Sequence, residues 1–517
     1  MPDAPARGEL AGRFVAIGQT QFTIDRSTAP ALRWKLYRGG QRITLDPHQP
    51  VTPGRADLGL AGRLLAESYG LTRQRWRAAP GGPKVEGLVQ PLLGPDTSAL
   101  ARDLLRPTPS GGGRFPCELY LAVQGVAGLP DGLYHYDAAH HALDLLRPGD
   151  AQGRVQAALA RPAQPAPALT LLLGVCFWKS LAAYGSFSYR LHSLDTGILA
   201  AQCLETARRY RLEATLHYRF LDGELADLLD LAAEHEGVYA AITLEGAQPG
   251  EAAPQPEAAP LPRQHNGGPS LSDVPLLAEL HRAVLADAPA AHKHRDLAPA
   301  EPPAGTDSIA LPTAAALELW RGAARRRSAV GWRRGAPLPP EQLGQILAAA
   351  AQGYRNDTLA GDQIRHTLLY CAIGNVAGIA PGVYRYDPAR HALAQIRSGD
   401  QGAALQATLR GQSYNMHGLH LCLAPVAHYG AGLRAYGDRW YRIQNIEAGL
   451  CLQRAGLAAS LLGLGSHTNL GYLVPPMDAL LQLPEGWTCL AQLLIGTSQP
   501  NGQTYEQTLD PRGAHHE

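Results

Sequence analysis

The sequence predicts an α+β fold that occurs in two tandem copies. Residues 119–150 align without gaps on residues 369–400, and 17 of the 32 positions are identical. Short apolar runs bounded by turn residues predict strands around this repeat, and longer runs with helical spacing predict helices. No strand–GxGxxG–helix unit occurs, which argues against a Rossmann domain. We therefore expect helices that cover a mainly antiparallel sheet in each copy.

A second match supports the same division, because residues 183–197 align on residues 435–449. A chain of 517 residues also exceeds a single ordinary domain of about 100–200 residues. The copies are predicted to span residues 1–246 and 313–517, joined by a linker rich in proline and alanine at 247–312.

The linker contains one predicted helix, at residues 271–288, with Ser272 or Asp273 as its cap. This helix is expected to dock on the surface, and the alternative is a lid over a pocket.

The other elements follow in order along each copy. In the first copy, strands are expected at 118–126, 132–137, 142–147 and 237–245, with a helix at 194–209. In the second copy, strands are expected at 367–376, 382–387, 419–426 and 488–496, with a helix at 446–462. The apolar run 168–178 is too short for the ~20 residues of a membrane span and predicts a buried strand.

Composition excludes several classes of protein. Lys+Arg 46 against Asp+Glu 45 leave a net charge of +1, which argues against nucleic-acid binding. The seven cysteines form no CxxC motif and no zinc-ligand spacing, so they are expected to be reduced thiols. No G-x-S-x-G elbow occurs, and the N-terminus lacks the apolar core of a secretory signal. A cytoplasmic protein without membrane or metal partners is expected.

Three motifs are candidates for ligand binding. The first, at 109–121, opens with Pro109, Ser110, Gly111, Gly112 and Gly113, whose bare backbone allows a flat ligand to approach and whose N–H groups can donate hydrogen bonds. A simple turn before a strand is the alternative.

The other two motifs lie in the second copy. Arg326, Arg327 and Ser328 suit a phosphate through guanidinium and hydroxyl hydrogen bonds, and a solvated basic corner is the alternative. The segment 461–472 contains Gly465 and Gly471, which permit ligand contact or serve only as ordinary helix capping.

Together these segments resemble the nitroreductase-like flavoproteins, and in particular the SagB-type thiazoline/oxazoline dehydrogenases. The resemblance rests on PSGGGRFPCELYL, GLYHYD and HALDLLRPGD in the first copy and on the Arg-Arg-Ser segment of the second. It implies a three-layer α/β/α fold, FMN, and a two-fold dimer in which each flavin is shared. In such a dimer, the Arg-Arg-Ser segment of one subunit holds the phosphate and the Pro-Ser-Gly segment of the other approaches the flavin.

The two copies have lost complementary halves of this site. An offset of 250 places residues 359–363 (LAGDQ) where the first copy has Pro109–Gly113. An offset near 283 places residues 43–45 (ITL) against Arg326–Ser328, and residues 211–214 (RLEA) replace 463–466 (GLGS). One composite site therefore keeps both halves. We expect an intramolecular pseudo-dimer, monomeric by chain count, with one FMN per chain.

The proposed catalytic residues follow from the same resemblance. The azoline-oxidising relatives carry Lys-Tyr where this chain has Ala183-Tyr184 and Ala435-Tyr436, so Tyr436 is the first candidate for the proton partner and Tyr184 the second. Lys179 is a candidate substitute for the missing lysine, although it lies five residues before Tyr184.

The expected activity is hydride transfer with a small organic or peptide-derived substrate, with NAD(P)H or O2 as redox partner. The alternatives are an NAD(P)H-dependent nitroreductase-like enzyme and a flavin-free scaffold of a peptide-modifying complex.

Overall fold

A computed structural model describes most of the chain. The described residues are 8–20, 34–37, 40–78, 100–255, 268–292, 308–358, 366–411, 414–498 and 504–509. Residues 359–363, which the sequence aligned with the glycine segment, lie outside them.

The N-terminal sheet has eight strands, antiparallel except at the edge formed by β8 and β12. Its strands are, in spatial order, β1 (Arg42–Thr44), β6 (Ala142–Pro148), β5 (Gly132–Asp137), β4 (Cys117–Val123), β7 (Leu169–Cys176), β9 (Glu236–Glu245), β8 (Glu213–His217) and β12 (Arg355–Asn356). Strand β7 is buried along its whole length, which explains the unbroken apolar run read as a strand.

The C-terminal sheet repeats this order. Its strands are β10 (Ser308–Ala310), β15 (Ala392–Ser398), β14 (Gly382–Asp387), β13 (Leu368–Ile373), β16 (Leu419–His428), β19 (Gln492–Ser498) and β11 (Trp332–Arg333), with β17 (Gly465–Asn469) on β19 and β18 (Trp487–Cys489) on β16. A third, three-stranded sheet joins β20 (Thr504–Thr508), β2 (Arg73–Ala78) and β3 (Leu100–Leu105).

Strand registers show which segments of the two sheets correspond. Arg42 pairs with Asp144 as Ser308 pairs with Ala394, so β1 and β10 hold equivalent edges of the two sheets. The Leu45 amide bonds the His141 carbonyl, as that of Leu311 bonds His391. The predicted match of residues 43–45 with Arg326–Ser328 is therefore wrong. The arginine segment lies in the connection between β10 and the next α-helix, and this connection is longer than the one that follows β1. Similarity between the two helices alone could not reveal this difference in length.

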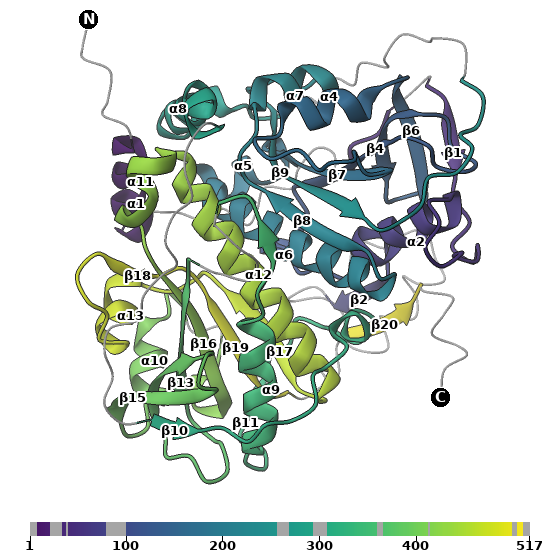
Figure 1. Cartoon of the computed structure of the whole chain (residues 1–517). Coiled ribbons are helices and arrows are strands. Elements are labelled where there is room, and N and C mark those ends of the chain that lie inside the picture. The colour runs from purple at the N-terminus through teal and green to yellow at the C-terminus, as the bar shows by residue number, and fades with distance from the viewer. Residues whose placement is uncertain are drawn as a thin grey trace, which may run out of the picture.

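Two long helices lie between the sheets and cross each other, α6 (Ser188–Arg209) and α12 (Arg439–Leu461) (Figure 1). Both are buried over most of their length because each is covered by a sheet on one side and by the other helix. At the crossing, a side chain on Gly197 would overlap the Ile446 carbonyl, and one on Gly449 would overlap the Leu194 carbonyl. The two contacts are equivalent under the offset of 252 seen in the sequence.

The remaining helices cover the outer faces and the junction. They are α1 (Glu9–Thr20), α2 (Leu58–Tyr69), α4 (Ala151–Ala158), α5 (Trp178–Tyr184), α7 (Asp222–Leu229), α8 (Pro275–His292), α9 (Pro340–Ala350), α10 (Gly402–Thr408), α11 (Gly430–Tyr436) and α13 (Val474–Leu480). No helix in the described ranges is long and apolar enough to cross a membrane.

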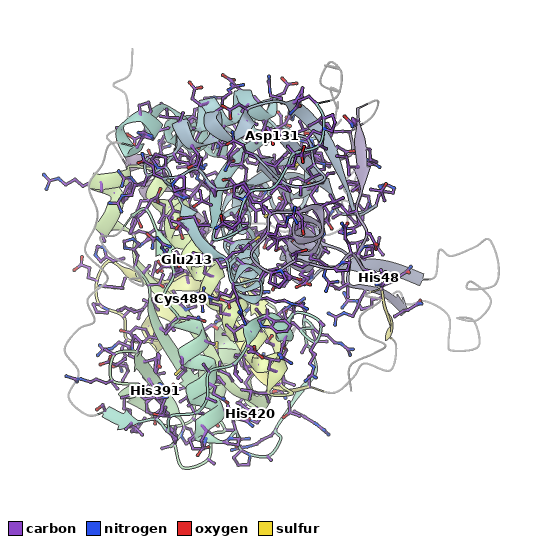
Figure 2. The ribbon with its side chains drawn as sticks, turned by 45° about the vertical axis from the view of Figure 1, so that its right-hand side comes forward. His48, Asp131, Glu213, His391, His420 and Cys489 are labelled. Atoms are coloured by element: carbon purple, nitrogen blue, oxygen red, sulfur yellow. The ribbon has the colours of Figure 1, made fainter. Side chains whose placement is uncertain are left out.

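The linker helix α8 docks on α1, α7, α11 and α12, beside the N-terminal helix (Figure 1). The predicted cap is only partly right: Ser270 and Asp273 form a capping box on a short 3-10 turn, and α8 starts after it. At the edge of the N-terminal sheet, Glu213 of β8 (labelled in Figure 2) pairs with Arg355 of β12 at 2.5 Å.

Candidate functional site

The three candidate motifs lie side by side at the junction of the two halves. The Arg326 Nε donates to the Pro107 carbonyl at 2.7 Å, which ties the arginine segment to the residues just before the glycine segment. Ser328 pairs with Ser466, and the Ala329 amide donates to the Ser466 carbonyl at 2.9 Å. We call this arrangement of residues 107–115, 326–328 and 465–472 the composite site.

The glycine segment forms a tight 3-10 turn, η1 (Gly111–Gly113), that only glycine can make here. Gly112 has φ +61°, and a Cβ on it would overlap the Tyr184 hydroxyl. A Cβ on Gly111 would lie 2.8 Å from the Leu191 side chain. The backbone of this turn is therefore bare on one side and backed by Tyr184 and Leu191 on the other.

Asp195 of α6 fixes the start of this turn through a hydrogen bond with Ser110. The Ser110 hydroxyl donates to the Asp195 carboxylate at 2.5 Å, and the Phe115 amide donates to the Ser110 Oγ at 2.9 Å. Burial raises the pKa of Asp195 to about 7, although its hydrogen bonds with Ser110 and the Gly111 amide lower it. Sequence reasoning aligned this residue but assigned it no role.

The end of the turn carries a non-glycine residue in the left-handed region, Phe115 at φ 48°. Such a conformation costs of order 1–3 kcal/mol and persists only where the surroundings hold it. The Lys179 Nζ donates to the Phe115 carbonyl at 3.2 Å, and the guanidinium of Arg106 lies 5.1 Å from the Phe115 ring centroid.

The arginine segment combines one buried and two exposed residues. Arg326 is buried, whereas Arg327 and Ser328 are exposed. The Arg73 side chain donates to the carbonyls of Ala324 (3.2 Å) and Arg326, and so fixes the backbone of this segment from the other half of the chain. Sequence reasoning missed Arg73, because nothing in its local context distinguishes it.

The third segment packs Leu470 against an apolar cluster of Ala183, Tyr184, Phe187 and Leu191. Gly465 is close to the arginine segment, since a Cβ on it would lie 2.6 Å from the Ala329 Cβ.

Polar contacts fix the end of this third segment. The Gly471 amide donates to the Asn469 Oδ1 at 2.9 Å, and its carbonyl accepts from the Arg410 amide at 2.9 Å. Burial, with Arg326 adding, lowers the pKa of His467 to about 4, so the imidazole is neutral.

On the other side of the junction lies a second location, where described residues of the two halves contact one another. The Asp357 carboxylate accepts from the amides of Tyr218 (2.9 Å) and Arg219 (3.0 Å). Asp222 pairs with both Arg439 and Arg442, and all three are buried. The α8 residue His281 lies against Phe177, with ring centroids 5.1 Å apart.

The structure separates the two candidate tyrosines. Tyr436 is 0% exposed, stacks on Trp440 and donates to the Thr358 carbonyl at 3.4 Å. Thr358 follows Asp357 of the second location. Tyr184 is 8% exposed and borders Gly112 and Leu470 in the composite site. Their sequence contexts are nearly the same, so only packing distinguishes them.

The residues of the composite site fit a flavin nucleotide. Two arginines and a serine provide charge and hydrogen bonds for a phosphate, and the bare glycine turn beside an apolar cluster suits a flat ring. Among the described residues, the buried Thr108 Oγ1 at its border has no hydrogen-bond partner.

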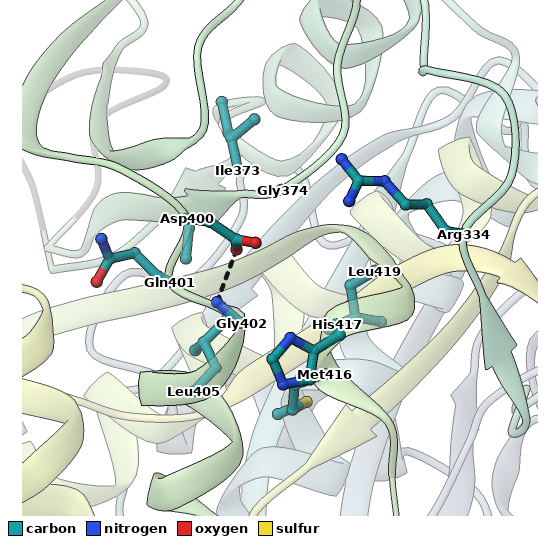
Figure 3. A pocket seen from close by; sticks show the side chains of 11 residues that line it. Arg334, Ile373, Gly374, Asp400, Gln401, Gly402, Leu405, Met416, His417 and Leu419 are labelled. Atoms are coloured by element: carbon teal, nitrogen blue, oxygen red, sulfur yellow. Dashed lines mark hydrogen bonds between the residues drawn. The ribbon is translucent and has the colours of Figure 1, made fainter.

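A small pocket lies in the C-terminal half (Figure 3). Arg334 faces Asp400 across it, and the Asp400 carboxylate accepts from the Gly402 amide at 2.9 Å. His417 completes its polar lining. This pocket contains none of the residues predicted to bind a ligand.

Comparison with solved structures defines the class of fold. A crystal structure of a protein from Anabaena variabilis ATCC 29413, described as a "putative nitroreductase", superposes with a TM-score of 0.74. The alignment covers 95% of this chain and 99% of that chain, at 22% sequence identity. The fold is therefore nitroreductase-like, as predicted.

Sequence comparison then assigns the family. The profile of the Nitroreductase family matches residues 323–497, and a relative from Methanocaldococcus jannaschii with the same description (MJ1384) is 30% identical over 171 residues, which are 31% of this chain and 82% of the relative. The chain belongs to the nitroreductase family. The trifolitoxin-processing protein TfxB of Rhizobium leguminosarum bv. trifolii is 43% identical over 49 residues, which are 9% of this chain and 13% of TfxB.

Proposed function

We propose that the protein is an FMN-dependent oxidoreductase with one composite flavin site per chain, acting by hydride transfer on a small organic or peptide-derived substrate. The observation that carries this proposal is the hydrogen bond from Arg326 of the C-terminal half to the Pro107 carbonyl of the N-terminal half. It holds the arginine segment against the residues just before the glycine segment. An FMN bound there would supply a hydride-accepting and hydride-donating ring.

Each segment then has a distinct role toward the cofactor. Arg326, Arg327 and Ser328 bind the phosphate, with Gly465 giving the segment room to approach. The glycine turn of Ser110, Gly111 and Gly112 presents its backbone to the ring, and Pro109 and Gly471 border it. The roles of the arginine segment and the glycine turn carry over from the SagB-type resemblance, and the positions of these residues in the structure are compatible with them.

The second location would hold no flavin. Asp357 places a carboxylate there, and Asp222 with its two arginines occupies the space beneath α8. The chain would thus be an asymmetric intramolecular pseudo-dimer that is monomeric in solution.

Tyr184, and not Tyr436, would be the proton partner. Its hydroxyl borders the glycine turn, while Tyr436 is enclosed by Trp440 and Thr358.

Two relatives suggest different substrates. The short match to TfxB, named for trifolitoxin processing, favours a peptide-derived substrate. The longer match to MJ1384 favours an NAD(P)H-dependent nitroreductase-like enzyme as the second candidate. Both would use the same site.

Titration of the flavin-free chain with FMN tests the proposal. We expect saturation at about one FMN per chain, measured by flavin fluorescence and by release and counting of bound flavin. Two FMN per chain would contradict the proposal that the second location holds no flavin, and no binding at all would favour the scaffold alternative.

The same titration includes Arg326→Ala. Loss of a charge-assisted hydrogen bond costs about 1.5–3 kcal/mol, so flavin affinity should fall roughly ten- to hundredfold. Thr44→Ala on the edge strand β1 is the control and should bind FMN as the wild type does.

A second prediction concerns Tyr184→Phe, which removes the hydroxyl and keeps the ring. Because a positioned proton donor contributes about 10²–10⁴-fold, the rate of reduction of a nitroaromatic or quinone acceptor by the dithionite-reduced protein should fall by at least tenfold. FMN affinity should stay unchanged. Tyr436→Phe is the matched control and should react at the wild-type rate. If Tyr436→Phe is slow and Tyr184→Phe reacts at the wild-type rate, Tyr436 is the proton partner.

A further inference from the structure

Lys179 and Glu118 form a buried ion pair directly behind the composite site. We propose that this pair consists of positioning residues, which hold the turn 110–115 in the conformation that receives the cofactor. The inference rests on the proposed function for its cofactor, and it assigns Lys179 a role different from the catalytic base that its sequence position suggested.

The turn is tied down at both of its ends. Asp195 accepts from Ser110 at the start, and Lys179 donates to the Phe115 carbonyl at the end, 3.2 Å away. The Phe115 amide donates back to Ser110, so both polar backbone groups of the left-handed residue are engaged. Without Lys179, the Phe115 carbonyl loses the donor that holds this conformation.

Lys179 is poorly placed to act as a base. It is 1% exposed, and its ammonium is directed at the Glu118 carboxylate and the Phe115 carbonyl. In both contacts the Lys179 ammonium acts as a hydrogen-bond donor and is directed at these two acceptors.

Glu118 is itself anchored by a row of alternating charges across four neighbouring strands. Its second oxygen lies 3.0 Å from His135 Nε2, and His135 faces Asp144, which pairs with Arg42 at 2.8 Å. Burial acts to raise the pKa of Glu118, but Lys179 and His135 outweigh it and lower the pKa to about 2. The carboxylate is therefore ionised throughout the working range, and it fixes Lys179 against the turn.

A matched control exists in the same half of the chain. Lys35 and Glu236 form another buried lysine–glutamate pair, and Lys35 also donates to the Tyr120 hydroxyl at 2.7 Å. Lys35 joins Tyr120 of β4 and Glu236 of β9, and its Nζ lies 5.1 Å from the Tyr37 ring centroid.

The test compares Lys179→Met/Glu118→Gln with Lys35→Met/Glu236→Gln, because each double change removes both charges and leaves no unpaired ion. In the flavin-free full-length chain, hydrogen exchange of the amides of residues 110–115 should accelerate at least tenfold in the first variant. Its FMN affinity should fall at least tenfold, with an altered visible circular dichroism of the bound flavin. The control should match the wild type within about twofold in exchange rate and in FMN affinity, and its bound flavin should have the same visible circular dichroism. Lys179→Arg should restore most of the FMN affinity.

Unchanged exchange and unchanged affinity in the folded double variant would overturn the proposal. So would a variant that binds FMN normally but loses a limb of its pH–rate profile, because that result identifies a base. If the double variant does not fold, Lys179→Gln replaces it with the same expectations, since Glu118 then still has His135. Should the wild type bind no FMN, the proposed function fails, while the exchange measurement still decides whether the pair holds the turn.

Discussion

Gly197→Ala is expected to destabilise the chain by about 3 kcal/mol or more, at the upper end of the cost of overpacking a core. A methyl group at this position overlaps the Ile446 carbonyl and lies 2.6 Å from the Ile446 carbonyl carbon, and both are backbone atoms that cannot rotate away. The central helices α6 and α12 would have to separate, which also opens the composite site between the halves. Urea unfolding followed by circular dichroism measures the loss.

Two further variants sharpen this result. Gly449→Ala should behave alike, because its methyl overlaps the Leu194 carbonyl on the facing helix. Gly223→Ala in α7 is the control, since nothing lies within 4 Å of a Cβ there. It should be neutral or stabilising by up to about 1 kcal/mol, from helix propensity alone. Wild-type stability in Gly197→Ala would show that the helices do not meet as described.

Asp222→Asn is the second change with a large expected effect. The carboxylate pairs with Arg439 and Arg442, and all three residues are buried, so its loss leaves two guanidinium groups without a counter-charge. Breaking a buried ion pair in this way costs about 3–5 kcal/mol. We expect a matching fall in the free energy of unfolding, measured by urea denaturation.

The control for this change lies one turn further along the same helix. Asp227 is exposed, so Asp227→Asn should stay within about 0.5 kcal/mol of the wild type. If the Asp222→Asn variant is stable and binds a second FMN, then Asp222, Arg439 and Arg442 only prevent FMN from binding at the second location. A stable variant that still binds one FMN would show that Asp222 contributes little to the packing.

Local patterns were sufficient to predict the α+β class, the repeat and most strands. Alternation and apolar runs are properties of a few consecutive residues, and a duplicated segment folds twice in the same way because it carries the same pattern twice. Strands β4, β5 and β6 and their counterparts therefore lie where expected. The helices were predicted to start too late, since α6 and α12 are buried on all sides near their beginnings and lose the amphipathic pattern there.

The sequence by itself predicted that glycines in one copy and arginines in the other form complementary half-sites, because motif residues and their spacing can be recognised in the linear chain. Only the tertiary structure decided which neighbours surround each of them. Tyr184 and Tyr436 have similar contexts, yet one borders Gly112 and the other is enclosed by Trp440. Lys179 is held against Phe115 by Glu118, and strand register places residues 43–45 beside β6 at the edge of the N-terminal sheet. Each of these outcomes depends on contacts between residues distant in sequence, and the environment of a side chain is determined by those contacts and not by its own segment.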